Sequence, residues 1–183
     1  MSKVKGTKIN SKINFLQEKY GDNVVEKVLG SLSPEDQSQL RSIVDLGWYE
    51  MELFLHLLEA IVQVVGKGND QILDRMGRYG AEDLSLHAYK VYFRSGDPEV
   101  VLSKMIPIHA SLNDPGEMEI ERRQDNELDV IVKAPRSGLA HCRVARAFYQ
   151  RCVELCEVAG ATVEETACSS RGADACVFHV TWN

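Results

Sequence analysis

The sequence predicts an α+β fold, in which an N-terminal helical bundle packs on an antiparallel sheet built from two hairpins flanking a long helix. Three observations predict this. Apolar residues recur at helical spacing between about residues 13 and 112, alternating stretches follow between 118 and 133, and β-branched and aromatic stretches close the chain after one more helical segment. A length of 183 residues suits one domain, residues 1–183, with 1–10 as a flexible polar start.

The helical segments carry recognisable start and stop signals. Residues 13–29 are amphipathic, with a break at Gly21 and a C-cap at Gly30. Ser33-Pro34-Glu35-Asp36 combines a capping serine, a proline at the first helical position and acidic residues in the first turn, which is typical of a helix start. Residues 48–65 are apolar over so much of the helix circumference that this helix is expected to be central or packed on two sides.

Two more helices are expected before the chain changes character. One covers residues 70–94 and is weakened in its middle by Gly77 and Gly80. The other covers 100–112, where Pro107 predicts a kink or an early stop.

The first hairpin is predicted by alternation, and the second by β-branched and aromatic residues. Residues 118–122 and 128–133 alternate between apolar and polar, and the polar turn between them predicts a hairpin. A helix then starts at Ser137 or Gly138 and runs to about residue 158, and Gly160 follows it as a C-cap. Residues 161–167 and 177–182 form the second hairpin.

Composition narrows the class of protein. The hydrophobic fraction of 44% and charged fraction of 26% are ordinary for a soluble protein. A net charge of -6 argues against nucleic acid as the main partner, because phosphate binding needs clustered Lys and Arg. No apolar run is long enough to span a membrane or to act as a secretory signal. Five cysteines, an odd number, indicate a reducing cytoplasm, where they are metal ligands or buried thiols.

The terminal hairpin carries the strongest chemical signal. Glu165 is followed three residues later by Cys168 and eight residues after that by Cys176, and a cluster of turn-forming residues separates the two thiols. A hairpin brings the thiols together at its turn, and Cys142 opens the preceding helix. Three sulfurs and one carboxylate make a closed tetrahedral set, which predicts a structural zinc ion that clips the helix to the hairpin. The alternative is that Cys142 and Cys176 are small, unreactive core residues, and core packing is also expected of Cys152 and Cys156.

The second half of the chain resembles the vinyl-reductase-like ligand-binding domain, which belongs to a superfamily with the haem nitric-oxide-binding domains and the TRAPP transport subunits. The resemblance rests on Pro135-Arg136-Ser137-Gly138-Leu139-Ala140-His141-Cys142, and then on Glu165, Cys168, Gly172, Cys176 and Phe178. Zinc-containing relatives have the same ligand spacing, so the resemblance implies zinc at Cys142, Glu165, Cys168 and Cys176.

Haem is the competing cofactor. Haem-binding relatives hold the propionates with a Tyr-x-Ser-x-Arg clamp just before the long helix, where this chain has Val132, Ala134 and Arg136. Only the arginine is retained. His109 lies upstream on a helix and is the available axial ligand, although its spacing fits poorly.

The function implied by the resemblance is that of a cytoplasmic sensor that holds a small hydrophobic molecule and signals through a regulatory protein partner or a dimer. A homodimer through the N-terminal helices is expected, because such packing would bury the excess apolar surface of residues 48–65. No fused DNA-binding or ATPase segment is expected. The resemblance also implies an apolar pocket, and the aromatic residues expected to line it are Trp48, Phe54, Tyr89, Tyr92 and Phe93. No Ser-His-Asp set, phosphate loop or paired carboxylate indicates an enzyme. A scaffold or adaptor without a ligand is the alternative, and a haem-based gas sensor is the least favoured.

Overall fold

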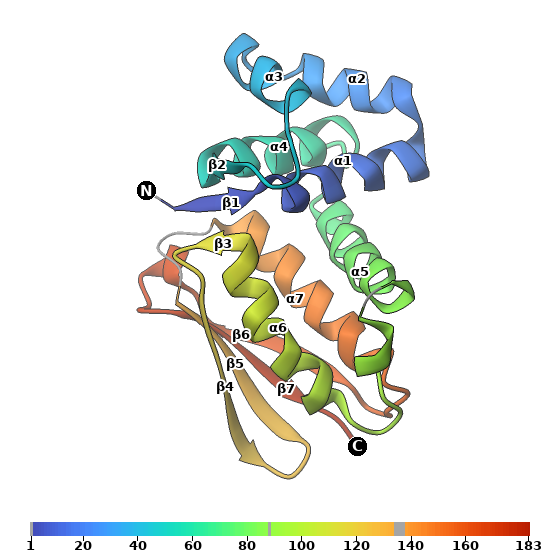
Figure 1. Cartoon of the computed structure of the whole chain (residues 1–183), viewed down its shortest axis with the longest axis vertical. Coiled ribbons are helices and arrows are strands. Elements are labelled where there is room, and N and C mark those ends of the chain that lie inside the picture. Colours follow the sequence, from blue (N-terminus) through green and yellow to red (C-terminus); the bar gives the residue numbers. More distant parts are fainter. Residues whose placement is uncertain (1, 88, 134–137) are drawn as a thin grey trace.

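The structure, a computed structural model, describes residues 2–87, 89–133 and 138–183 (Figure 1). The N-terminal lobe consists of β1 (Lys3–Lys5), α1 (Gly6–Tyr20), α2 (Asp22–Gly30), α3 (Pro34–Arg41), β2 (Trp48–Glu50) and α4 (Met51–Val64). The C-terminal lobe consists of η1 (Lys90–Tyr92), α6 (Pro98–Leu112), β4 (Glu117–Gln124), β5 (Glu127–Lys133), α7 (Leu139–Glu154), β6 (Thr162–Ala167), η2 (Ser169–Arg171) and β7 (Cys176–Thr181). Helix α5 (Gln71–Leu86) joins the lobes and lies beside α7. The predicted α+β fold class is confirmed.

The helix starts follow their capping signals. The Asp36 backbone N–H donates to Ser33 Oγ at 3.1 Å, and Pro34 takes the first helical position of α3. Asp97 caps α6 in the same way, ahead of Pro98. Helix α6 continues through Pro107 to Leu112. The predicted early stop therefore does not occur, although the proline has no N–H to donate within the helix.

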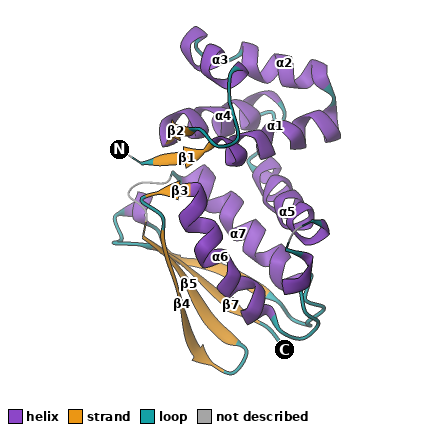
Figure 2. Cartoon of the chain, viewed as in Figure 1, coloured by secondary structure: helices purple, strands orange, loops and turns teal. Residues whose placement is uncertain are grey.

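The main sheet has four antiparallel strands in the order β4-β5-β7-β6. Val130 of β5 lies opposite Phe178 of β7, and this register puts alternate side chains of both strands under α6 and α7, which cover one face of the sheet (Figure 2). Strand β4 forms one edge, where the exposed residues Glu117, Glu119 and Glu121 alternate with more buried apolar ones.

The structure also contains a second, smaller sheet that the sequence does not predict. Strand β1 pairs with β2 and with β3 (Asn113–Asp114), so residues in the predicted polar start are part of a three-stranded sheet. Val4 is fully buried there. The β1 strand leads directly into α1, which begins at Gly6.

Helix α4 is central, as its composition predicts. Its residues Leu53, Phe54, Leu57, Leu58 and Ile61 are all buried in the core of the N-terminal lobe. The apolar surface that motivated the homodimer prediction is therefore covered within the chain itself, and the homodimer stays a prediction.

Helices α5 and α7 make the most extensive helix–helix contact of the described residues. A Cβ atom at Gly77 would collide with the backbone carbonyl oxygen of Val144 and would lie 2.9 Å from Ala147 Cβ. Helix α7 also belongs to both cores, since Val144 packs in the N-terminal core while Tyr149 packs in the C-terminal one. Among the described residues, no helix is long and apolar enough to cross a membrane.

Candidate functional site

The predicted thiol–carboxylate group comes together in space. Cys142 Sγ at the start of α7 lies 3.8 Å from Cys168 Sγ and 3.5 Å from Cys176 Sγ. With a carboxylate oxygen of Glu165, the four side-chain atoms all lie within 4.8 Å of one another. The three cysteines are at most 3% exposed, and burial raises the pKa of the Cys168 thiol.

Cys142 and Glu165 of this group line an open groove of about 730 Å³ between α4, α5, α7 and the terminal hairpin. Arg171 Nη1 approaches Glu165 Oε2 at 3.6 Å, while Glu165 Oε1 is buried without a hydrogen-bond partner among the described residues. Arg143, which also lines the groove, pairs instead with Asp70 and Asp74 of α5. The remaining cysteines, Cys152 and Cys156, are fully buried in the C-terminal core.

The aromatic residues predicted to line a pocket lie in three separate places. Trp48 on β2 is 42% exposed, with Lys5 Nζ 4.1 Å from its ring centroid. Phe54 is fully buried in the N-terminal core. Tyr89, Tyr92 and Phe93 lie half-buried after α5, at the outer side of the C-terminal core.

A cavity of about 240 Å³ lies between α1, α5, α6 and α7, and none of those five aromatic residues lines it. Its apolar wall is formed by Leu84, Met105, Ile108, Leu112, Phe148 and Tyr149. Its polar wall is formed by Lys8, Lys12, Asp83, His109, Asn113 and His141. The cavity therefore has an apolar part and a part that is rich in nitrogen groups.

The two lysines stand on one face of α1, one turn apart. Lys8 Nζ donates to Asn113 Oδ1 at 2.6 Å and lies 2.8 Å from His141 Nε2. Lys12 is 7% exposed, and among the described residues no carboxylate oxygen lies within 4.0 Å of its ammonium group. Burial lowers the pKa of Lys8 to about 7 and that of Lys12 to about 8.

Two histidines complete the nitrogen-rich part. His141 packs edge-on against Phe54 with 5.8 Å between ring centroids, and its Nδ1 is buried without a hydrogen-bond partner among the described residues. His109 Nε2 on α6 is buried without one as well. Burial lowers the pKa of His109 to about 4 and holds that of His141 well below its usual value, so both rings are neutral near pH 7.

Comparison with protein families matches residues 5–147 to the family described as Haem-NO-binding. Among solved structures, the chain is similar to an Fe(II) unliganded H-NOX protein from K. algicida, with 16% identity and a TM-score of 0.70 over 98% of this chain and 96% of that one. It is also similar to an H-NOX protein from S. oneidensis in the Fe(II)NO state, with 15% identity and a TM-score of 0.73 over 98% and 99% of the two chains. No curated protein matches the chain.

A match over this much of the sequence defines the class of protein: a ligand-binding sensor domain rather than an enzyme. The chain belongs to the haem-NO-binding family. Kinship with that family is thereby confirmed, whereas the vinyl-reductase-like label stays a prediction. The match also includes the helical first half, in which the sequence alone shows no family motif.

The family corrects the cofactor prediction. Zinc was predicted as a structural cofactor at Cys142, Glu165, Cys168 and Cys176, but the cofactor that the family description names is haem. The prediction of zinc is therefore wrong. The four residues do meet in space because the hairpin and the first turn of α7 bring them together, and the three cysteines are also packed in the C-terminal core.

The cavity meets one requirement of haem and fails others. One observation fits: His109 offers a buried imidazole nitrogen with no other partner among the described residues, as an axial ligand would. Three observations do not fit. The cavity of about 240 Å³ is smaller than the ~300–1,000 Å³ that drug-sized ligands occupy, and Lys8 and Lys12 project into it. Val132 has no polar side-chain atom for a propionate and is buried in the core. Ala134 and Arg136 lie outside the described residues. The cavity as it stands does not fit haem.

Sequence reasoning missed the two lysines of this site. Residues 1–10 read as a polar start, so Lys8 was not assigned to a helix face. The available signal was the spacing of Lys8 and Lys12 by one helical turn, with both flanked by apolar residues that form the inward face of α1. His141 lies within the motif that carries the family resemblance, but a lone histidine is more often a surface or hydrogen-bonded core residue than a ligand.

Proposed function

We propose that this chain is a small-molecule sensor of the haem-NO-binding family whose ligand occupies the cavity between α1, α5, α6 and α7. The observation that supports this is a partly apolar cavity holding several polar side chains, two of them with buried ring nitrogens that have no partner among the described residues. Ligand sites in proteins have this composition: mostly apolar walls and a few polar groups that fix orientation.

Occupancy of the cavity would act on the contact between the two lobes. The cavity is walled by α1 of the N-terminal lobe and by α6 and α7 of the C-terminal lobe. Val144 both lines the cavity and supplies the carbonyl oxygen against which Gly77 of α5 packs. A ligand that binds one arrangement of these helices more tightly shifts the population towards it, and a regulatory protein partner reads the change.

The test uses four probes of similar size: phenol, indole, phenylacetamide and phenylacetate. At least one is expected to raise the melting temperature of the full chain, measured by differential scanning calorimetry, because a ligand that binds only the folded state stabilises it. The variant Ala145→Phe, which places a ring in the cavity, should remove that increase. Failure of all four probes, or an increase that Ala145→Phe leaves unchanged, would contradict the proposal.

Haem-based gas sensing is the second candidate, and His109 is the observation that favours it. Titration with hemin, followed by absorption spectroscopy, separates the two candidates. A one-to-one complex whose spectrum changes in the variant His109→Ala would establish haem binding through that imidazole and would replace the first candidate. Weak binding that is the same in both proteins leaves the first candidate standing.

A further inference from the structure

We propose that the ligand of this cavity is a small organic carboxylate with an apolar body, whose carboxylate group is bound by Lys8 and Lys12. This inference rests on the proposed function and specifies the chemical class of the ligand. It starts from the arrangement of charge in the cavity wall: two ammonium groups enter from one face of α1, while the apolar side chains of the wall come from α5, α6 and α7.

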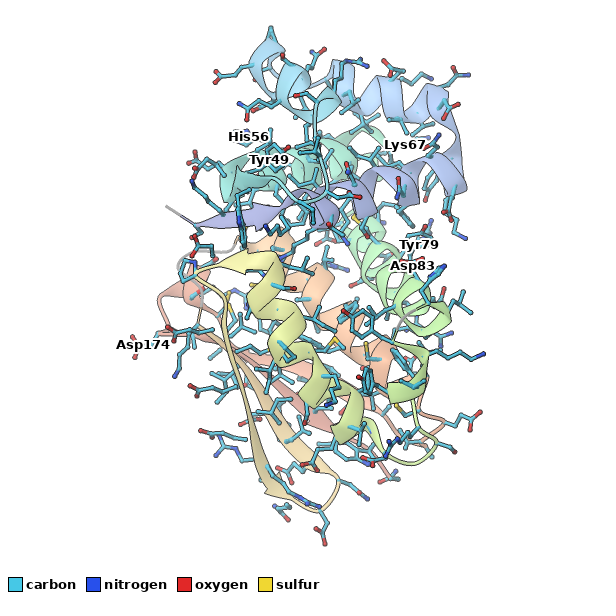
Figure 3. All side chains as sticks on the ribbon, viewed as in Figure 1. Tyr49, His56, Lys67, Tyr79, Asp83 and Asp174 are labelled. Carbon is cyan, nitrogen blue, oxygen red and sulfur yellow. The ribbon has the colours of Figure 1, made fainter. Side chains whose placement is uncertain are left out.

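The first supporting feature is the lack of a counter-charge close to Lys8 and Lys12. A buried ammonium group is costly unless a counter-charge accompanies it. Among the described residues, neither lysine has a carboxylate oxygen within 4.0 Å. The Asp83 carboxylate of α5, on the turn after Tyr79 (Figure 3), belongs to the cavity wall but its side chain is 55% exposed and pairs with His87. A ligand carboxylate between Lys8 and Lys12 would supply the missing charge.

The second supporting feature is the orientation of the polar groups in the cavity. Lys8 is held by the Asn113 side chain and by the His141 ring, so its ammonium group is positioned before any ligand arrives. His141 Nδ1 and His109 Nε2 are buried without partners among the described residues, and they offer further hydrogen-bonding positions to a ligand oxygen. A pre-positioned donor set binds an anion without the cost of ordering side chains.

The third supporting feature is the size of the cavity. An apolar cavity of about 150 Å³ is enough to bind benzene. The cavity of about 240 Å³ therefore has room for one ring or a short aliphatic chain together with a carboxylate. Phe148, Tyr149 and Met105 form the wall around the apolar body of such a molecule.

The titration of the lysines agrees with this geometry. Burial lowers the pKa of Lys8 to about 7 and that of Lys12 to about 8, so both lose their protons close to neutral pH in the absence of a ligand. The groups that face them are Asp83 on α5, His109 on α6, and His141 and Cys142 on α7. Because the histidines are neutral near pH 7, the charge offered to an anion is that of the lysines. Carboxylate binding should therefore weaken as the pH rises above about 8.

The experiment compares phenylacetate with phenylacetamide, which has the same shape without the charge, by isothermal titration calorimetry on the full chain at about pH 6.5 and pH 9. Phenylacetate should bind at least about 10-fold more tightly than the amide at the lower pH, since hydrogen bonds between charged groups are about twice as strong as neutral ones. The preference should shrink at the higher pH. Equal binding of the two probes would overturn the inference but leave the cavity function standing; binding of neither would overturn the inference.

Matched variants locate the effect. Lys12→Met keeps the length of the side chain and removes the charge, and it should lower phenylacetate affinity about 10-fold while changing amide affinity less than about 3-fold. Lys8→Met should act in the same direction. Lys19→Met, on the exposed end of the same helix, is the control and should change neither. A phenylacetate preference that survives both cavity substitutions would overturn the assignment to these lysines. Circular dichroism of each variant separates lost binding from lost folding.

Discussion

Lys8 and Lys12 each carry a charge that the folded protein disfavours. Their pKa values are about 7 and about 8 in the folded state against about 10.5 for an exposed lysine, because burial penalises the ammonium form. Below pH 7 both the folded and unfolded chains hold these protons, and the cost is fully present. As the pH rises towards about 10, the folded protein releases them first, so their contribution to stability increases.

The expected result is that the free energy of unfolding of the ligand-free protein rises between about pH 7 and pH 9, by up to roughly 1 kcal/mol per pH unit for each lysine. Guanidinium unfolding followed by circular dichroism at several pH values measures this. The double variant Lys8→Met, Lys12→Met should show a flatter dependence than the parent chain. Parallel curves for the two proteins would show that these lysines do not titrate in this range.

At the same scale, the sequence predicts some site residues and not others. The grouping of Glu165, Cys168 and Cys176 follows from hairpin geometry, since strand pairing fixes which residues meet at a turn, while Cys142 on α7 was added from the family spacing. The grouping of Lys8 with His109 and His141 depends on three helices that are far apart in the sequence. Spacing within one segment carries no information about that packing.

At the scale of elements, helix α5 carries two glycines, Gly77 and Gly80, that look equivalent in the sequence. Both read as weak points of a helix. In the structure, Gly77 is where the α5 backbone meets α7, whereas a Cβ atom at Gly80 would lie 3.6 Å from the Phe148 ring, an ordinary van der Waals distance. Local propensity does not distinguish a glycine needed for packing from one that is not.

The two substitutions should therefore have opposite effects on stability. Gly77→Ala is expected to destabilise the protein by about 1–3 kcal/mol, because the helices must move apart. Gly80→Ala is expected to stabilise it by about 0.5–1 kcal/mol, through the better helix propensity of alanine. Equilibrium unfolding in guanidinium gives both values. Similar changes of the same sign would show that α5 does not approach α7 closely at Gly77.

Some of the strands could be predicted from the sequence and others could not. The first hairpin was predictable from alternation and the second from its β-branched and aromatic residues, and their observed bounds differ from the prediction by two residues or fewer at each end. Strand β1 was not, because three residues are too few to show a period. Its partners β2 and β3 lie more than 40 residues away.

For the molecule as a whole, the question is whether the two lobes fold together. Helix α7 contributes side chains to both cores, and ion pairs such as Arg78–Glu154 at 2.7 Å and Arg143–Asp74 at 2.6 Å join it to α5. Neither core is complete without α7. The lobes are therefore expected to unfold in one cooperative transition.

The two tryptophans allow a direct measurement, because Trp48 lies in the N-terminal lobe and Trp182 at the end of the C-terminal one. The variants Trp48→Phe and Trp182→Phe each leave one fluorescent reporter. Fluorescence and circular dichroism should give the same denaturant midpoint within each variant. A reporter that changes at a clearly different concentration from the helical signal would show lobes that unfold separately.

Strand β4 carries a consequence for the behaviour of the protein in concentrated solution. An open strand normally invites the same strand of a neighbouring molecule to hydrogen-bond to it, which leads to fibres and precipitation. Here the exposed side chains of the strand are charged, with Glu117, Glu119 and Glu121 followed by Arg122 and Arg123. Covering these charges with a second strand would cost solvation, which favours molecules that stay dispersed, and replacing the three glutamates with apolar residues would be the direct route to aggregation.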